Sequence, residues 1–192
     1  MGETSSEERG ALQRLVDGCL ARDERAIRGL IERYQGRVMA LCCRMLAHHQ
    51  DAEDVAQETF VRVVRSISKW DRTREFEPWL LAIAANRCKT LLSQRGRLMR
   101  APIVEEPSCG KAGEERAAKQ LTEELQLGLL QLRMEYRQAF VLFHEHEMSY
   151  QEIADTLSSP LGTIKTWVHR ARQELIQFLT RRGVIAETQH AV

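Results

Sequence analysis

Apolar residues recur every three or four positions along most of this 192-residue chain, and they fall into two blocks. The first block runs from about Ala11 to Leu92, and the second from Leu121 to about Leu179. This spacing gives an α-helix one apolar face, and no stretch shows the strict alternation of a β-strand. Residues 96–118, between the blocks, instead mix proline, glycine and charge, which is typical of a flexible linker.

We therefore predict an all-α protein with two small helical domains joined by a flexible linker. The length suits one domain or two small ones, and a hydrophobic share of 43% is enough for packed cores. The boundaries we expect are an N-terminal tail at 1–10, a first domain at 11–97, a linker at 98–118, a second domain at 119–182 and a C-terminal tail at 183–192.

Charge is strongly patterned, although the net charge is only +1. Residues 86–100 carry five basic side chains and no acid, whereas residues 51–58 carry four acids and no base. Residues 163–182 carry five bases and one acid. Two basic segments and one acidic segment indicate two nucleic-acid contacts and one protein contact, and the alternative is that all three are solvated helix faces.

Several classes of protein are disfavoured by what the sequence lacks. There is no run of 18 apolar residues, the N-terminus does not resemble a signal peptide, and five cysteines include no CxxC pair. We expect a reduced, cytoplasmic protein without a membrane span, metal, cofactor or small-molecule substrate. The histidines of HEHEM, His144 and His146, lack the HExxH spacing, and no nucleophile–base set appears, so we do not expect an enzyme.

The stretch from Ser149 to Arg172 has the pattern of two short helices around a tight turn. Ser149 and Glu152 form a capping box, Ser158 to Gly162 supply the turn, and Thr163 is the expected cap of the second helix. In that helix the apolar residues lie on one side and the polar residues on the other. The apolar side holds Ile164, Val168, Ala171 and Leu175; the polar side holds Lys165, Thr166, His169, Arg170 and Gln173.

This arrangement predicts a helix-turn-helix with polar and basic residues outward near the start of the second helix. A helix of that kind fits the major groove, where Lys or Arg can pair with guanine and Thr or His can contact base edges or phosphates. Trp167 borders the apolar side, and its role stays open between packing and stacking on DNA.

Two helical stretches of the first domain carry further candidates. In DAEDVAQETFVRVV, Asp51, Asp54 and Glu58 share one exposed face, either as a solvated acidic surface or as a protein contact. In FEPWLLAIAANRCKTLLSQRGR, Asn86 and Lys89 share a face with Ser93, opposite the apolar residues. The preceding loop is bordered by Trp70, which either stacks on a base or anchors the loop to the core.

These stretches, in this order, resemble regions 2 and 4 of bacterial sigma factors, above all the extracytoplasmic-function (ECF) group. The similarity covers residues 11–97 and 119–180. It implies a protein without catalytic activity that binds core RNA polymerase, through the β′ clamp and the β flap, and directs promoter-specific transcription initiation. Many relatives are held inactive by an anti-sigma factor, so such a factor is a further candidate partner.

The resemblance also assigns roles to individual residues. Lys165, Thr166, His169 and Arg170 correspond to the positions that read the −35 promoter element, with Thr163 and Arg172 at phosphates. Asn86 corresponds to a residue that holds a base flipped out of the −10 element, with Lys89, Trp70 and the loop 71–75 nearby. The surface that docks on the β′ clamp corresponds to Asp54, Gln57 and Glu58. Phosphate contacts are also expected for Arg95, Arg97 and Arg100.

A rival hypothesis is a two-domain helix-turn-helix regulator that binds DNA without polymerase. It accounts for the hairpin, but it leaves the acidic face of Asp54, Gln57 and Glu58 and the helix of Asn86 without a role. Binding of the isolated protein to duplex promoter DNA is the observation that separates the two hypotheses.

Overall fold

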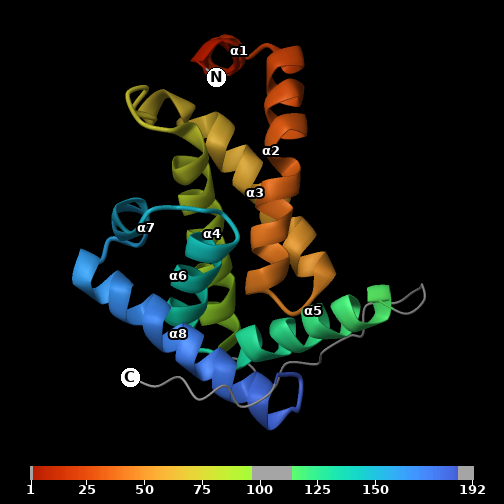
Figure 1. Ribbon diagram of the computed structural model, residues 1–192. Coiled ribbons are helices and arrows are strands. Elements are labelled where there is room, and N and C mark those ends of the chain that lie inside the picture. The colour runs from red at the N-terminus through yellow and green to blue at the C-terminus, as the bar shows by residue number, and fades with distance from the viewer. Residues whose placement is uncertain (1, 97–113, 186–192) are drawn as a thin grey trace.

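The computed structural model describes residues 2–96 and 114–185, and in these residues it contains only helices, turns and loops. The first four helices form one unit and the last four a second unit (Figure 1). In chain order they are α1 (Gly2–Leu20), α2 (Glu24–Met45), α3 (His49–Ser66), a 3₁₀ turn (Ile67–Lys69), α4 (Phe76–Gly96), α5 (Glu114–Gln131), α6 (Met134–His144), α7 (Tyr150–Leu157) and α8 (Leu161–Arg181). The prediction of an all-α fold is confirmed.

The first unit is built around α2, which packs against α1, α3 and α4. Residues of α2 spaced three or four apart are fully buried, among them Val38, Leu41 and Met45. The start of α4 is fixed by an aromatic cluster in which the ring of Phe76 lies 5.1 Å from Trp70 and 5.2 Å from Tyr34. Aromatic side chains bury large apolar areas, so this cluster sets where the loop before α4 sits.

The turn between α1 and α2 brings the backbones of the two helices close together. A Cβ atom placed on Gly18 would lie 2.3 Å from the Cβ of Ala26, so only glycine fits without movement. Arg22 turns the chain with a φ of 60°, and the Asp23 side chain then caps α2 by accepting a hydrogen bond from the Arg25 backbone N–H at 3.1 Å.

The second unit packs α8 against α5, α6 and α7. The four apolar positions predicted to face inward on α8 are all buried: Ile164, Val168, Ala171 and Leu175. The predicted capping box is present, since the Ser149 hydroxyl accepts from the Glu152 backbone N–H and the Glu152 carboxylate accepts from the Ser149 backbone N–H. The turn follows at Ser158, whose left-handed backbone ends α7.

One expectation about this hairpin is wrong. Thr163 does not cap α8, because the helix begins at Leu161 with Pro160 at the capping position. The Pro160 carbonyl already accepts hydrogen bonds from the backbone N–H groups of Thr163 and Ile164, at 2.9 and 3.1 Å. Proline fixes φ near the helical value, so the helix starts at once after it and Thr163 falls in the first turn.

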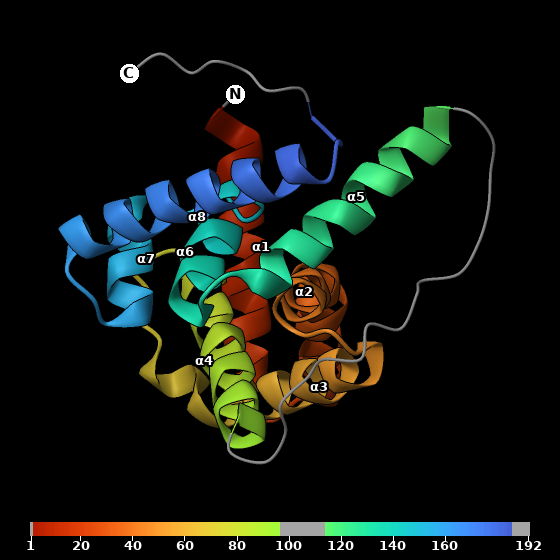
Figure 2. The same cartoon turned by 90° about the horizontal axis from the view of Figure 1, so that it is seen from below.

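The two units lie against each other. Helix α7 contacts α4, and α5 and α6 contact α2, so the buried residues of both units belong to one apolar cluster. Figure 2 shows α6 beside α4, and α5 crossing beside the end of α2. Helices α1 and α5 begin at Gly2 and Glu114, inside the segments predicted as tail and linker.

Residues 97–113, most of the predicted linker, and 186–192 of the predicted C-terminal tail lie outside the described residues. None of the helices in the described part of the chain combines the length and apolarity needed to cross a membrane.

Candidate nucleic-acid interface

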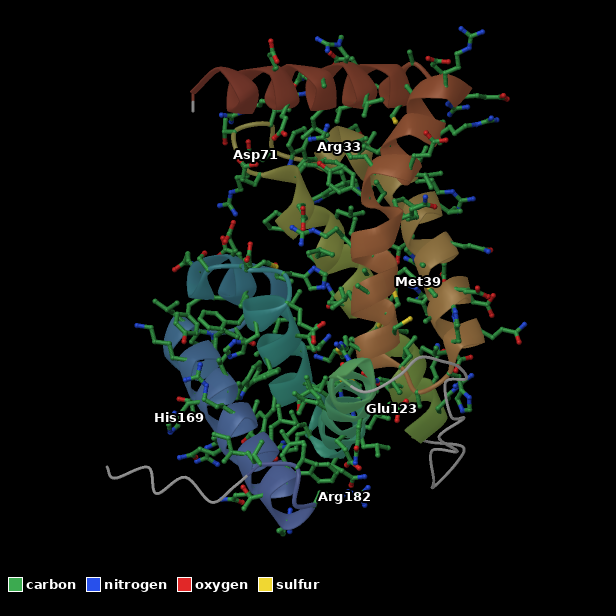
Figure 3. All side chains as sticks on the ribbon, turned by 45° about the vertical axis from the view of Figure 1, so that its right-hand side comes forward. Arg33, Met39, Asp71, Glu123, His169 and Arg182 are labelled. Atoms are coloured by element: carbon green, nitrogen blue, oxygen red, sulfur yellow. The ribbon has the colours of Figure 1, made fainter. Side chains whose placement is uncertain are left out.

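The outward side of α8 presents the polar residues that the sequence predicted. Lys165, Thr166, His169 and Arg170 are all exposed, and together with Gln173, Glu174 and Gln177 they line a shallow depression of about 640 Å³. Figure 3 shows His169 on the side of α8 that faces away from the rest of the protein. The first turns of a long helix thus offer hydrogen-bonding and cationic groups to solvent, as a helix that enters a DNA groove must.

Some side chains beside the outward face of α8 are accessible to solvent, and others pack against the core. Arg172 is exposed and Thr163 is half-buried, so both reach the rim of the same face. The Thr166 hydroxyl donates to the Gly162 carbonyl at 2.9 Å. Trp167 is half-buried and packs against the apolar core, and this supports the structural interpretation of that residue.

Helix α4 presents a second polar face. Asn86, Lys89 and Ser93 are exposed, while Ala85 and Cys88 beside them are buried. The side-chain amide of Asn86 is therefore accessible to a binding partner. Because it is exposed, its polar atoms carry no desolvation cost in the folded protein. The sequence-based expectation of an outward Asn86 agrees with its place in the fold.

The loop before α4 has an internally ordered turn. The Asp71 carboxylate accepts hydrogen bonds from the Thr73 backbone N–H at 2.9 Å and from the Thr73 hydroxyl at 2.7 Å. These two bonds hold the pKa of Asp71 below its usual value. Asp71 to Glu75 are all exposed, so the loop offers its polar atoms to solvent at one end of α4.

Trp70, in contrast, does not lie on the surface. Its side chain is 8% exposed and meets Phe76 edge to face. Of the two interpretations left open by the sequence, the position of Trp70 agrees with anchoring the loop to the core. A base could stack on this ring only after the loop had moved.

The acidic face of α3 is more structured than the sequence suggested. Asp54 and Gln57 are exposed, but Glu58 binds two arginines, Arg62 on the same helix and Arg87 on α4. Partial burial alone would raise the pKa of Glu58, but the hydrogen bonds from Arg87 and Arg62 outweigh it and lower the pKa. Glu58 thus stays ionised and joins α3 to α4 as well as facing solvent.

Sequence reasoning missed one residue of this face. Val61 lies between the polar residues of α3 with 48% of its surface exposed, a position that helical spacing from Asp54 and Gln57 could have identified. Arg95, expected at DNA phosphates, forms an ion pair with Asp51, with Nη2 and Oδ1 2.6 Å apart. The expected phosphate contacts Arg97 and Arg100 lie outside the described residues.

Comparisons with known proteins agree with this geometry. The family described as Sigma-70 region 2 matches residues 30–98, and the family described as Sigma-70, region 4 matches residues 122–175. The chain is 34% identical over 159 residues to the ECF RNA polymerase sigma factor SigE of Mycolicibacterium smegmatis, covering 80% of this chain and 62% of that protein. It is 32% identical over 168 residues to the ECF RNA polymerase sigma factor SigW of Bacillus subtilis, covering 80% of this chain and 88% of that one.

A solved structure supports the fold. The sigma factor RpoE of Bartonella quintana, determined in complex with the anti-sigma factor NepR, is 21% identical and superimposes with a TM-score of 0.67. The match covers 80% of this chain and 96% of that chain.

Proposed function

Because the chain belongs to the ECF sigma factors of RNA polymerase, a non-enzymatic family of transcription initiation factors, we propose which of its side chains read the promoter and which bind the polymerase. Helix α8 reads the −35 element, the outer face of α4 captures the −10 element, and α3 docks on the core enzyme. The observation that carries the proposal is the polar face of α8, exposed along its first turns and opposite a fully apolar side.

The −35 element is read in the major groove by Lys165, Thr166, His169 and Arg170. Lys165 and Arg170 are cations on exposed helix positions, so they suit guanine edges, and a good base contact of this kind contributes about 1–3 kcal/mol of discrimination. Arg172 and the rim residue Thr163 contact phosphates, and these contacts add affinity that weakens as salt rises.

The −10 element is captured on α4. Asn86 offers both a hydrogen-bond donor and an acceptor to an unstacked base, and the exposed Lys89, one turn away, meets the adjacent phosphate. The loop from Asp71 to Glu75 forms the side of the pocket, and Trp70 supports it from below through its contact with Phe76. Capture of the base offsets an opening cost of a few kcal/mol.

Core polymerase is bound through α3. Asp54, Gln57 and Glu58 present polar atoms around the exposed side chain of Val61, a combination of apolar contact and charge that gives both affinity and register. The partner surface is the β′ clamp, while the second unit reaches the β flap. The protein then acts in the cytoplasm, where core polymerase and promoter DNA meet.

The division of labour is tested by single substitutions in a promoter-opening assay with core polymerase. Asn86→Ala removes the base contact and is expected to slow open-complex formation about tenfold or more, with core binding unchanged. Gln94→Ala, which removes an equally exposed amide about two turns further along α4, is the matched control. An Asn86→Ala protein that opens promoters at the normal rate contradicts the assignment.

Single substitutions also test the contacts with the −35 element. Lys165→Ala and Arg170→Ala are expected to lower affinity for the −35 element by about 5- to 150-fold each, without affecting core binding. Arg181→Ala removes an equally exposed cation from the last turn of α8 and should have little effect. Loss of core binding in Lys165→Ala would show that α8 serves the polymerase contact instead.

A further inference from the structure

Helix α1 lies beside the loop from Asp71 to Glu75, here called the −10 loop, although α1 precedes residue 30, where the match to Sigma-70 region 2 begins. The helix contacts the 3₁₀ turn Ile67–Lys69, which is separated from the −10 loop by a single residue. Figure 3 shows Asp71, at the start of the loop, close to α1. The −10 loop is therefore the part of the promoter-reading surface that α1 can influence.

An ion pair joins the helix to the −10 loop. The Nη2 atom of Arg72 donates to the Oδ1 atom of Asp17 at 2.7 Å, although 55 positions separate the two residues in sequence. The side chains of Arg72 and Asp17 are 44% and 56% exposed, so water also reaches both groups. Ion pairs as exposed as this one contribute little on average, because two side chains must be ordered to form them. Its effect here depends on how firmly the backbone holds each partner.

The backbone on the Asp17 side is fixed by packing. Val16 and Cys19, close to Asp17 on α1, are buried in the core of the first unit. Gly18 approaches Ala26 of α2 so closely that a Cβ atom on Gly18 would lie 2.3 Å from the Ala26 Cβ. Asp17 therefore moves only if α1 shifts against α2, which the close packing of the core resists. Its carboxylate is a fixed point to which the −10 loop is tied.

The backbone on the Arg72 side forms a closed turn. The Asp71 carboxylate accepts a hydrogen bond from the Thr73 backbone N–H at 2.9 Å, and the Asp71 carbonyl accepts one from the Arg74 backbone N–H at 3.0 Å. These bonds make the turn move as one body, with Arg72 inside it. All residues of the −10 loop are exposed, so the turn can pivot on its two ends. The ion pair with Asp17 opposes that movement.

We propose that Asp17 is a positioning residue for promoter opening, which holds the −10 loop through Arg72 at the angle that closes the pocket around the captured base. The inference rests on the function proposed above, in which this loop forms one side of the pocket and Asn86 meets the base. A loop that pivots away leaves the pocket open for part of the time, and the apparent affinity for the flipped base falls by that fraction. Asp17 acts through Arg72 and does not touch DNA itself.

Substitution of Asp17 tests the proposal with core polymerase. Asp17→Asn removes the charge and keeps the size of the side chain. We expect it to slow promoter opening about two- to fivefold, the effect of losing an ordered surface ion pair, and to leave core binding unchanged. Asp17→Glu retains a carboxylate and should recover most of the rate. The matched control is Glu8→Gln, which removes an exposed carboxylate nearer the start of α1 and should have no effect. An Asp17→Asn protein that opens promoters at the normal rate overturns the proposal.

Two further measurements separate positioning from a general loss of structure. In an Arg72→Gln background, Asp17→Asn should have no additional effect, because the ion pair is already absent. Asp17→Asn should also weaken binding of a single-stranded −10 oligonucleotide to the complex with core polymerase, by about two- to fivefold. An oligonucleotide with an abasic site at the captured position should bind the variant and the unmutated protein equally. An effect that persists in the Arg72→Gln background, or an equal loss for both oligonucleotides, contradicts an action through the loop.

Hydrogen exchange in the free protein reports on the −10 loop without polymerase. The backbone amides of Thr73 and Arg74 donate hydrogen bonds within the turn, so their exchange measures how often the turn opens. Asp17→Asn should speed this exchange about two- to fivefold, and Glu8→Gln should not change it. Unchanged exchange in Asp17→Asn overturns the proposal. If exchange responds as expected but the unmutated protein opens no promoter with core polymerase, the proposed function fails and the hold of Asp17 on the loop stands.

Discussion

His146 gives this protein a specific sensitivity to mild acid. The residue lies between α6 and α7 with 6% of its surface exposed, and neither ring nitrogen has a hydrogen-bond partner among the described residues. Burial, with a smaller contribution from the charge of Arg37, lowers the pKa of His146 to about 4. The folded protein therefore holds this imidazole neutral and resists its protonation.

The sign and size follow from proton linkage. The unfolded chain takes up the proton near a pKa of about 6.5 whereas the folded chain does not, so the free energy of unfolding falls as the pH drops from about 6.5 toward 4. At pH 5 the loss relative to pH 8 amounts to up to about 2 kcal/mol. Above pH 7.5 the contribution is fully present and the pH dependence from this residue vanishes.

Urea unfolding at pH 8 and pH 5 measures this loss. His146→Leu replaces the ring with an apolar side chain, so it should remove about 2 kcal/mol of the difference between the two pH values. His169→Leu is the control, since His169 is exposed on α8 and its removal should leave most of the difference in place. The reasoning is refuted if the unmutated protein and His146→Leu lose the same free energy between pH 8 and pH 5.

Three further predictions concern local packing. Gly18→Ala forces a Cβ against Ala26, so we expect the free energy of unfolding to fall by about 1–3 kcal/mol in a denaturant titration, and an unchanged value contradicts the tight corner. Ser149→Ala breaks the capping box of α7 and should cost about 1 kcal/mol by the same titration, while Ser149→Asp should recover most of it. Phe76→Ala removes the centre of the aromatic cluster, and we expect a loss of about 3–5 kcal/mol together with faster hydrogen exchange in the loop 71–75; unchanged exchange there contradicts the anchoring role.

Local features of the fold could be predicted from the sequence because they depend on nearby residues. The inward positions of α8, the capping box at Ser149 and the exposed Asn86 all follow from helical spacing within one element. The exception is the start of α8, where Pro160 sets the backbone before Thr163 can cap it.

Features that depend on how helices pack could not be predicted in the same way. The ion pair between Glu58 and Arg87 requires the angle between α3 and α4, and the burial of Trp70 requires the position of Phe76. In the sequence, Arg137 looks like an ordinary polar residue of a helix. Its hydrogen bonds to the Met45 and Leu130 carbonyls form only because the ends of α2 and α5, which are far apart in sequence, meet in the fold.

The central claim is that this chain gives core RNA polymerase its promoter specificity. Run-off transcription with purified core polymerase on genomic fragments, with and without the protein, tests it most directly. We expect defined start sites only when the protein is added, and we expect Asn86→Ala to abolish most of this transcription while Gln94→Ala retains it. The same pattern of transcripts with and without the protein would contradict the account.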